Sequence, residues 1–187
     1  MGRSDWVSGD IMSHILAALT RENRLAILTS LYTGLRIGDV LDLRTERVRN
    51  AAAAAHGGGI RLTVRESKTG KNRRVGLPAG LVDDLLAIAG KIYIFESRTD
   101  RRRHRTRQAV YKDIKRAAAA FRLPKKLQVS PHTARKMYAV RAYQQSADVR
   151  KVQRLLQHSD EAVTMIYAMA DELTARKIGG AVRGSRV

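Results

Sequence analysis

The sequence predicts an α+β fold that is mainly α-helical and contains one small antiparallel β-sheet. Apolar residues recur at helical spacing through most of the chain, whereas strict alternation of apolar and polar residues is confined to two neighbouring segments. The 187 residues are 44% apolar and carry no clear boundary signal, so we expect one compact domain over residues 1–187. Residues 1–9 are expected to form a loose leader, and residues 179–187 a flexible tail.

The first elements predicted are two helices. Asp10 can cap the first helix, and the second spans roughly Glu22 to Tyr32 and ends at Gly34. Their inward residues are expected to be Ile11, Ile15, Leu16, Leu19, Leu25, Leu28 and Leu31. A short helix from Val40 to Leu43 follows. Residues 51–59 are a low-complexity run of alanine and glycine around one histidine, which predicts a spacer or flexible turn.

The sheet is predicted as a hairpin. Ile60 to Arg65 alternates apolar and polar residues, which is typical of a half-buried strand, and Arg73 to Leu77 is its expected partner. Thr69 to Asn72 forms the turn, so Lys68 lies near the hairpin tip. Ile92 to Phe95 is either a brief strand or a core anchor. The remaining helices are predicted at about Ala79 to Ala89, Lys112 to Phe121, Pro131 onward, Asp148 to His158, and Ser159 onward.

The charge of the chain favours a polyanionic partner. Lys and Arg number 36 against 17 Asp and Glu, which gives a net charge of +19 and a pI near 11.1. Charge alone leaves DNA and RNA open, but 5% aromatic residues suit duplex phosphates better than single-strand stacking. The densest basic segment, Arg98 to Arg107, is either a solvated loop or a clamp on phosphates. The candidate DNA contacts are Arg101, Arg102, Arg103, Arg105, Arg107 and Lys112.

Several classes of protein are excluded by composition. The chain has no cysteine, so it has neither a disulfide framework nor a thiol nucleophile. No apolar run is long enough to span a bilayer, and the N-terminus lacks a secretory pattern. We therefore expect a soluble cytoplasmic protein with no membrane partner.

The residues around position 132 outline a phosphate site. Ser130 is a good N-cap, Pro131 suits the first helical position, and His132 falls in the first turn. Arg135 lies three residues on and shares that face, beside a helix end whose amides favour an anion. A single His or Tyr is usually structural, so the spacing of the whole set carries the hypothesis.

This spacing resembles the catalytic domain of the tyrosine recombinase (phage integrase) family. The pattern His-x-x-Arg, then a His after a Leu-Leu pair, then a Tyr nine positions later resembles its second half. Thr33 to Val40 resembles the segment that bears its first catalytic Arg, and Ser67 to Gly70 resembles the turn that bears its catalytic Lys. The matching residues, in order, are Arg36, Lys68, His132, Arg135, His158 and Tyr167. Asp39 could hold Arg36 in place or could begin the short helix.

The resemblance implies a site-specific recombinase that cleaves and rejoins DNA through a covalent 3′-phosphotyrosyl link. Arg36 and Arg135 would bind the phosphate, and Tyr167 would attack it. Lys68 would protonate the leaving 5′ oxygen, and His132 would assist proton transfer with the tyrosine.

His158 would hydrogen-bond the phosphate. No cofactor, metal or ATP is implied, because the sequence has no His-x-x-x-His motif, no carboxylate cluster and no Walker-type loop. The resemblance also implies double-stranded DNA as partner, with self-association as a dimer or tetramer on it. It suggests a prokaryotic, nucleoid-associated protein of phage or mobile-element origin.

Two other functions stay open from the sequence. A type IB topoisomerase would use the same active-site chemistry to relax supercoils. A non-catalytic basic DNA- or RNA-binding module would use the same residues only to hold phosphate. The family's usual N-terminal DNA-clamping domain is expected to be absent, since there is no room for it before the Asp10 helix.

Overall fold

The computed structural model describes residues 7–123 and 127–156. They belong to two compact units, residues 1–138 and 139–187, and the boundary falls inside one helix. The candidate residues His158 and Tyr167, the helix expected from Ser159 and the expected tail lie outside the described residues.

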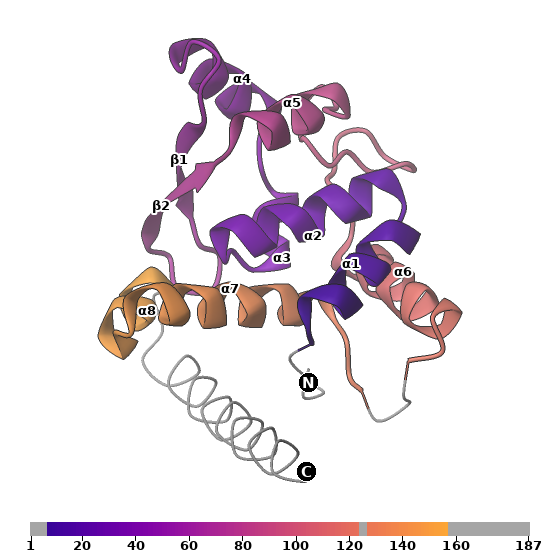
Figure 1. Cartoon of the computed structure of the whole chain (residues 1–187). Coiled ribbons are helices and arrows are strands. Elements are labelled where there is room, and N and C mark those ends of the chain that lie inside the picture. Colours follow the sequence, from indigo (N-terminus) through magenta and orange to yellow (C-terminus); the bar gives the residue numbers. More distant parts are fainter. Residues whose placement is uncertain (1–6, 124–126, 157–187) are drawn as a thin grey trace, which may run out of the picture. The chain divides into compact units, whose positions relative to one another are not determined.

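The described residues form helices and one two-stranded antiparallel sheet, which confirms the predicted fold class (Figure 1). In chain order the elements are α1 (Gly9–Ala18), α2 (Arg21–Thr33), α3 (Ile37–Leu41), α4 (Thr45–Ala54), β1 (Ile60–Arg65), β2 (Asn72–Leu77), α5 (Ala79–Ala87), α6 (Arg107–Ala120), α7 (Pro131–Ser146) and α8 (Val149–Leu156).

Helix α1 begins one residue earlier than its predicted cap. Ser8 is the N-cap, and its Oγ accepts a hydrogen bond from the Ile11 N–H at 3.4 Å. Asp10 lies in the first turn, where a negatively charged carboxylate interacts favourably with the positive end of the helix dipole. Val7 is only 2% exposed and belongs to the core. The leader predicted over residues 1–9 is therefore wrong for residues 7–9, because burying a valine and capping a helix both fix the chain there.

Helix α2 crosses the middle of the N-terminal unit and packs against α1, α3, α5 and β2 (Figure 1). It buries residues on most sides, among them the predicted Leu25 and Leu31. The helix ends where predicted, because Gly34 adopts a left-handed conformation (φ 66°) and its N–H donates to the Ser30 carbonyl.

Two predictions between α2 and the sheet need correction. Helix α3 begins at Ile37 rather than Val40, with Arg36 as its N-cap. Residues 51–54, predicted as part of a flexible spacer, instead complete α4. Alanine has the highest helix propensity, so a short alanine run extends a helix that is already anchored by the fully buried Val48.

The hairpin has the predicted strands, and β2 begins one residue earlier than expected, at Asn72. Ile60 pairs with Leu77 and Val64 with Arg73, and buried and exposed residues alternate along both strands. Residues 66–71 connect the strands. Ile94 and Phe95 are almost fully buried, so the segment after α5 serves as a core anchor.

Helix α6 is tied to the α1–α2 turn by a buried carboxylate. Asp113 Oδ2 accepts from the Thr20 N–H at 2.9 Å and from Asn23 Nδ2 at 2.8 Å, and Arg116 Nη2 donates to Oδ1 at 2.7 Å. Burial by itself would raise the pKa of Asp113. The hydrogen bonds from Asn23, Thr20 and Arg116 outweigh it, so the pKa lies below the ordinary value.

Asp113→Asn is expected to lower the free energy of unfolding by about 1–3 kcal/mol at neutral pH, because an amide cannot accept all of these bonds. The stabilisation by Asp113 is present above the ordinary aspartate pKa and is lost as pH falls through the lowered folded pKa. Urea unfolding at several pH values measures both effects. A wild-type advantage that persists unchanged into strong acid would contradict the assignment.

Candidate active site

The N-terminus of α7 is capped from both directions. Ser130 Oγ accepts from the His132 N–H at 3.2 Å, and Thr133 Oγ1 accepts from the Ser130 N–H at 3.2 Å. Pro131 is the first helical residue, as predicted. His132 is exposed and Arg135 is 4% exposed, so the helix presents the imidazole to solvent and buries the guanidinium.

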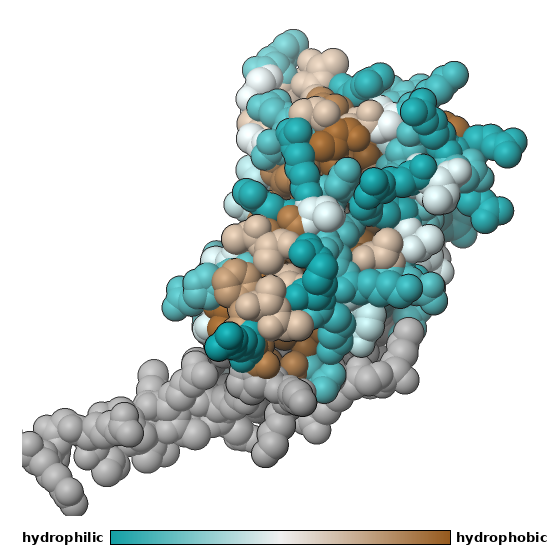
Figure 2. Space-filling model, turned by 90° about the vertical axis from the view of Figure 1, so that its right-hand side faces the viewer, coloured by the Kyte–Doolittle hydropathy of each residue, from teal (hydrophilic) through white to brown (hydrophobic). Residues whose placement is uncertain are grey.

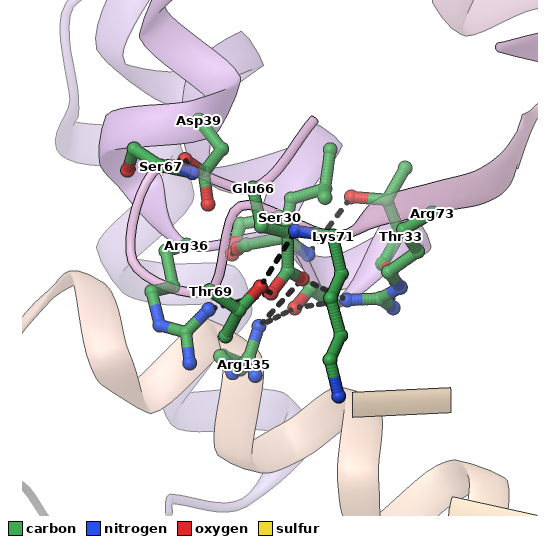
Figure 3. A network of polar contacts seen from close by, with 12 residues as sticks. Ser30, Thr33, Arg36, Asp39, Glu66, Ser67, Thr69, Lys71, Arg73 and Arg135 are labelled. Atoms are coloured by element: carbon green, nitrogen blue, oxygen red, sulfur yellow. Dashed lines mark hydrogen bonds and ion pairs between the residues drawn. The ribbon is translucent and has the colours of Figure 1, made fainter. Parts of the chain in front are cut away.

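Three arginines meet at one buried carboxylate, that of Glu66, which is 0% exposed (Figure 3). Arg36 Nη1 lies 2.7 Å from Glu66 Oε2, and Arg73 Nη1 lies 3.1 Å from Oε1. Arg135 Nη1 lies 3.7 Å from the same Oε1. The carboxylate thus joins α7, β2 and the residue before α3, which are far apart in the sequence.

The C-terminal end of α2 holds two of these arginines. The Gly34 carbonyl accepts from Arg135 Nη1 at 2.6 Å and from Arg73 Nη1 at 3.2 Å. Arg73 Nη2 also donates to the Thr33 carbonyl. Carbonyls at a helix C-terminus carry partial negative charge, so they suit guanidinium groups there.

The pKa of Glu66 is lowered despite its position. Burial opposes ionisation, but the hydrogen bond from Arg73, the charge of Arg135, and the hydrogen bond and charge of Arg36 outweigh it. Glu66 is therefore ionised at neutral pH, and the four groups together carry a net charge of about +2.

Arg36 retains hydrogen-bonding capacity in this cluster. Its side chain is 12% exposed, and within the described residues its Nη2 is buried without a hydrogen-bond partner. A buried donor without a partner is costly and needs an explanation, and a bound ligand is one such explanation. A phosphate oxygen would satisfy this one.

The Asp39 carboxylate binds Ser67 and not the Arg36 guanidinium, which one of the two sequence hypotheses had expected it to hold. Its Oδ1 accepts from the Ser67 N–H at 2.9 Å and from Ser67 Oγ at 2.7 Å. Asp39 lies in the first turn of α3, in line with the other hypothesis, and Glu66 supports Arg36 in its place.

Lys68 is exposed in the turn between the strands, near the hairpin tip as expected. The base of this turn is fixed by backbone bonds from the Glu66 N–H to the Lys71 carbonyl at 2.9 Å and from the Gly70 N–H to the Glu66 carbonyl at 2.8 Å. Lys68 thus lies two residues after Glu66, whose carboxylate contacts the three arginines.

Sequence reasoning missed Glu66 and Arg73. Both continue the inward rows of the hairpin, since Glu66 follows Leu62 and Val64 at steps of two, and Arg73 precedes Val75 in the same way. A charged residue on each inward row, near the same end of a hairpin, was the available signal for a buried ion pair.

The basic segment divides into exposed and buried residues. The side chains of Arg101, Arg102 and Arg103 are 90%, 89% and 83% exposed and lie 3.6–3.8 Å from Glu96 or Asp100. Such exposed pairs are weak and leave the arginines available to phosphate. Arg107 and Lys112 are exposed on α6.

Arg105 differs from its neighbours. It is 8% exposed, and its Nη2 lies 3.8 Å from Glu22 Oε2. Arg105 is thus buried where the other candidate DNA contacts are exposed, and its Nε has no hydrogen-bond partner among the described residues. Its contact with DNA stays a prediction.

The described part of the chain offers no cluster of three or more His, Cys, Asp or Glu suited to a metal ion. None of its helices has the length and apolar character needed to cross a membrane. On the face shown in Figure 2, hydrophilic side chains predominate and apolar ones gather in small separate areas.

Comparison with known proteins identifies the family. The model of the phage integrase family matches residues 6–173. The chain belongs to this family. It is 32% identical over 149 residues to the probable integrase/recombinase YoeC of Bacillus subtilis. The matched residues make up 77% of this chain and 75% of YoeC. It is 31% identical over 157 residues to the tyrosine recombinase XerD of Lacticaseibacillus casei, which covers 76% of this chain and 48% of that protein.

Solved structures of the family share the fold. A crystal structure of XerA recombinase superposes with a TM-score of 0.67 at 24% identity, over 100% of this chain and 68% of that one. A crystal structure of a lambda integrase dimer bound to a core site superposes with a TM-score of 0.66 at 22% identity. The match covers 88% of this chain and 60% of the integrase chain. The chain spans about half the length of several curated relatives, for example 56% of a Thermosipho africanus tyrosine recombinase.

Proposed function

We propose that this phage integrase family chain cleaves and rejoins double-stranded DNA at specific sites through a 3′-phosphotyrosyl intermediate, without metal or ATP. The observation that carries the proposal is the meeting of Arg36 and Arg135, two guanidiniums from distant segments, at one buried carboxylate two residues before Lys68. This arrangement suits a scissile phosphate, because guanidinium matches phosphate geometry and stays charged.

The proposed reaction has two steps. The Tyr167 phenol oxygen attacks the phosphorus, a phosphorus–oxygen bond to tyrosine forms, and the bond to the 5′ oxygen breaks. Lys68 gives its proton to the leaving 5′ oxygen, and His132 accepts the phenol proton. A 5′-hydroxyl then reverses these steps, and no ATP is required because the phosphotyrosyl ester keeps the energy of the original bond.

The arginines lower the barrier by charge. The two guanidiniums stabilise negative charge on the phosphate oxygens as the transition state forms, and His158 is proposed to add a hydrogen bond. Tyr167 and His158 enter the proposal from their match to the family pattern, since both lie outside the described residues.

Assembly on DNA belongs to the same proposal. Lambda integrase has been solved as a dimer bound to a core site and as a tetramer bound to a Holliday junction. We propose that this chain likewise self-associates on duplex DNA, with Arg101–Arg103, Arg107 and Lys112 as phosphate contacts and the nucleoid as its location. Origin from a phage or mobile element also remains a proposal.

Trapping on a nicked suicide duplex in EDTA tests the enzymatic proposal. The wild-type chain should form a covalent protein–DNA adduct, and Tyr167→Phe should form none, because the variant lacks the phenol oxygen. Denaturing gel electrophoresis measures the adduct. Tight duplex binding with no wild-type adduct on several substrates would favour a non-catalytic module. Relaxation of plasmid without recombination would favour a type IB topoisomerase.

A further inference from the structure

We propose that Glu66 is a positioning residue for DNA cleavage: its carboxylate fixes Arg36 and Arg135 relative to each other and to the Lys68 turn. The inference rests on the proposed function and extends it to a residue outside the family pattern described above.

The two oxygens of the Glu66 carboxylate contact different arginines. Oε2 binds Arg36 Nη1 at 2.7 Å, and Oε1 lies 3.7 Å from Arg135 Nη1 (Figure 3). Because one rigid carboxylate reaches both arginines, movement of Glu66 would change the spacing of the two guanidiniums. Catalytic rates are sensitive to such displacements, since misplacement by about 1 Å can lower a rate about a hundredfold.

Charge gives Glu66 a second role. Arg36, Arg73 and Arg135 bring three positive charges to a site where the carboxylate is 0% exposed, and like charges in such surroundings repel strongly. Arg73 Nη1 binds Glu66 Oε1 at 3.1 Å and the Gly34 carbonyl at 3.2 Å, so it anchors the carboxylate to the end of α2. Glu66 thereby makes a close pair of phosphate-binding arginines possible before DNA arrives.

The backbone of Glu66 links this pair to the proposed general acid. Its N–H and carbonyl both bond within the turn, to Lys71 and Gly70, and Asp39 holds the next residue, Ser67. Glu66 therefore connects the turn that carries Lys68 to Arg36 and Arg135, through its backbone on one side and its carboxylate on the other.

An alternative is that Glu66 inhibits the enzyme by occupying the position where the phosphate would bind. The structure fits this alternative less well. Arg36 is partly exposed whereas Glu66 is wholly buried, so the guanidinium is the group of this pair that a ligand can reach. The Nη2 of Arg36 also lacks a hydrogen-bond partner among the described residues while Nη1 holds Glu66. Glu66 therefore leaves one donor nitrogen of that guanidinium unused.

The test compares Glu66→Gln, Glu66→Asp and the matched control Asp113→Asn in the full chain. Asp113 is also a buried carboxylate paired with an arginine, but it lies outside the site. Single-turnover cleavage of the suicide duplex, equilibrium binding of an uncleaved duplex and urea stability are measured for each. For Glu66→Gln we expect cleavage to fall about 10- to 100-fold, with duplex binding unchanged or tighter because one negative charge is lost. Glu66→Asp should recover part of the rate, and Asp113→Asn should lose stability without this loss of cleavage.

Three results would overturn the inference. Cleavage by Glu66→Gln at the wild-type rate would show that no positioning is needed, and faster cleavage would mean that Glu66 inhibits. A loss of cleavage that matches the loss of binding, or is equalled by Asp113→Asn, would mean that Glu66 is merely structural. Absence of any wild-type adduct would instead remove the proposed function, and the inference with it.

Discussion

Arg135→Ala is expected to lower the rate constant of DNA cleavage by about a hundredfold to a thousandfold while leaving much of the non-specific DNA binding. In the proposed mechanism this guanidinium stabilises charge that develops on one phosphate, whereas non-specific binding would be spread over many contacts of a chain with a net charge of +19. Single-turnover trapping on the suicide duplex measures the first quantity, and a gel-shift titration at fixed salt measures the second.

Two companion variants make this result specific. Arg36→Ala should have the same effect with less loss of stability, because its side chain is 12% exposed against 5% for Arg135. Arg101→Ala, at 90% exposure, should weaken binding slightly and leave the cleavage rate at saturating DNA unchanged. Equal losses of binding and cleavage in the Arg36 and Arg135 variants would contradict the prediction that these arginines act mainly in DNA cleavage and contribute little to non-specific DNA binding.

Gly34→Ala is expected to lower the free energy of unfolding by about 2–4 kcal/mol. The residue has φ 66°, which strains any side chain, and an added Cβ would overlap the ring of Tyr138. Since the Gly34 carbonyl accepts from Arg73 and Arg135, the shift needed to relieve the overlap should also slow cleavage. Urea unfolding and the trapping assay measure the two effects.

Gly57 provides the matched comparison. Its φ is 86°, but an added Cβ there meets nothing within 4 Å. Gly57→Ala should therefore show only the backbone strain, about 1 kcal/mol, with normal cleavage. If the two variants lose the same stability, the contact with Tyr138 is unimportant.

Local signals predicted the elements that local forces stabilise. Alternation specified both strands of the hairpin, and Gly34 marked the end of α2 because glycine tolerates positive φ. The caps of α7 followed from Ser130 and Pro131. The prediction for residues 51–54 was wrong because low complexity was given more weight than the helix propensity of alanine.

The sequence by itself determined the mainly helical fold, the basic character and the ordered residue pattern that places the chain in the phage integrase family. The tertiary structure alone decided which groups meet: Glu66 rather than Asp39 supports Arg36, and Arg105 is buried beside Glu22. The physical reason is that helix and strand patterns depend on residues a few positions apart. An ion pair such as Glu66 with Arg135 depends on how distant segments pack, which spacing along the chain does not encode.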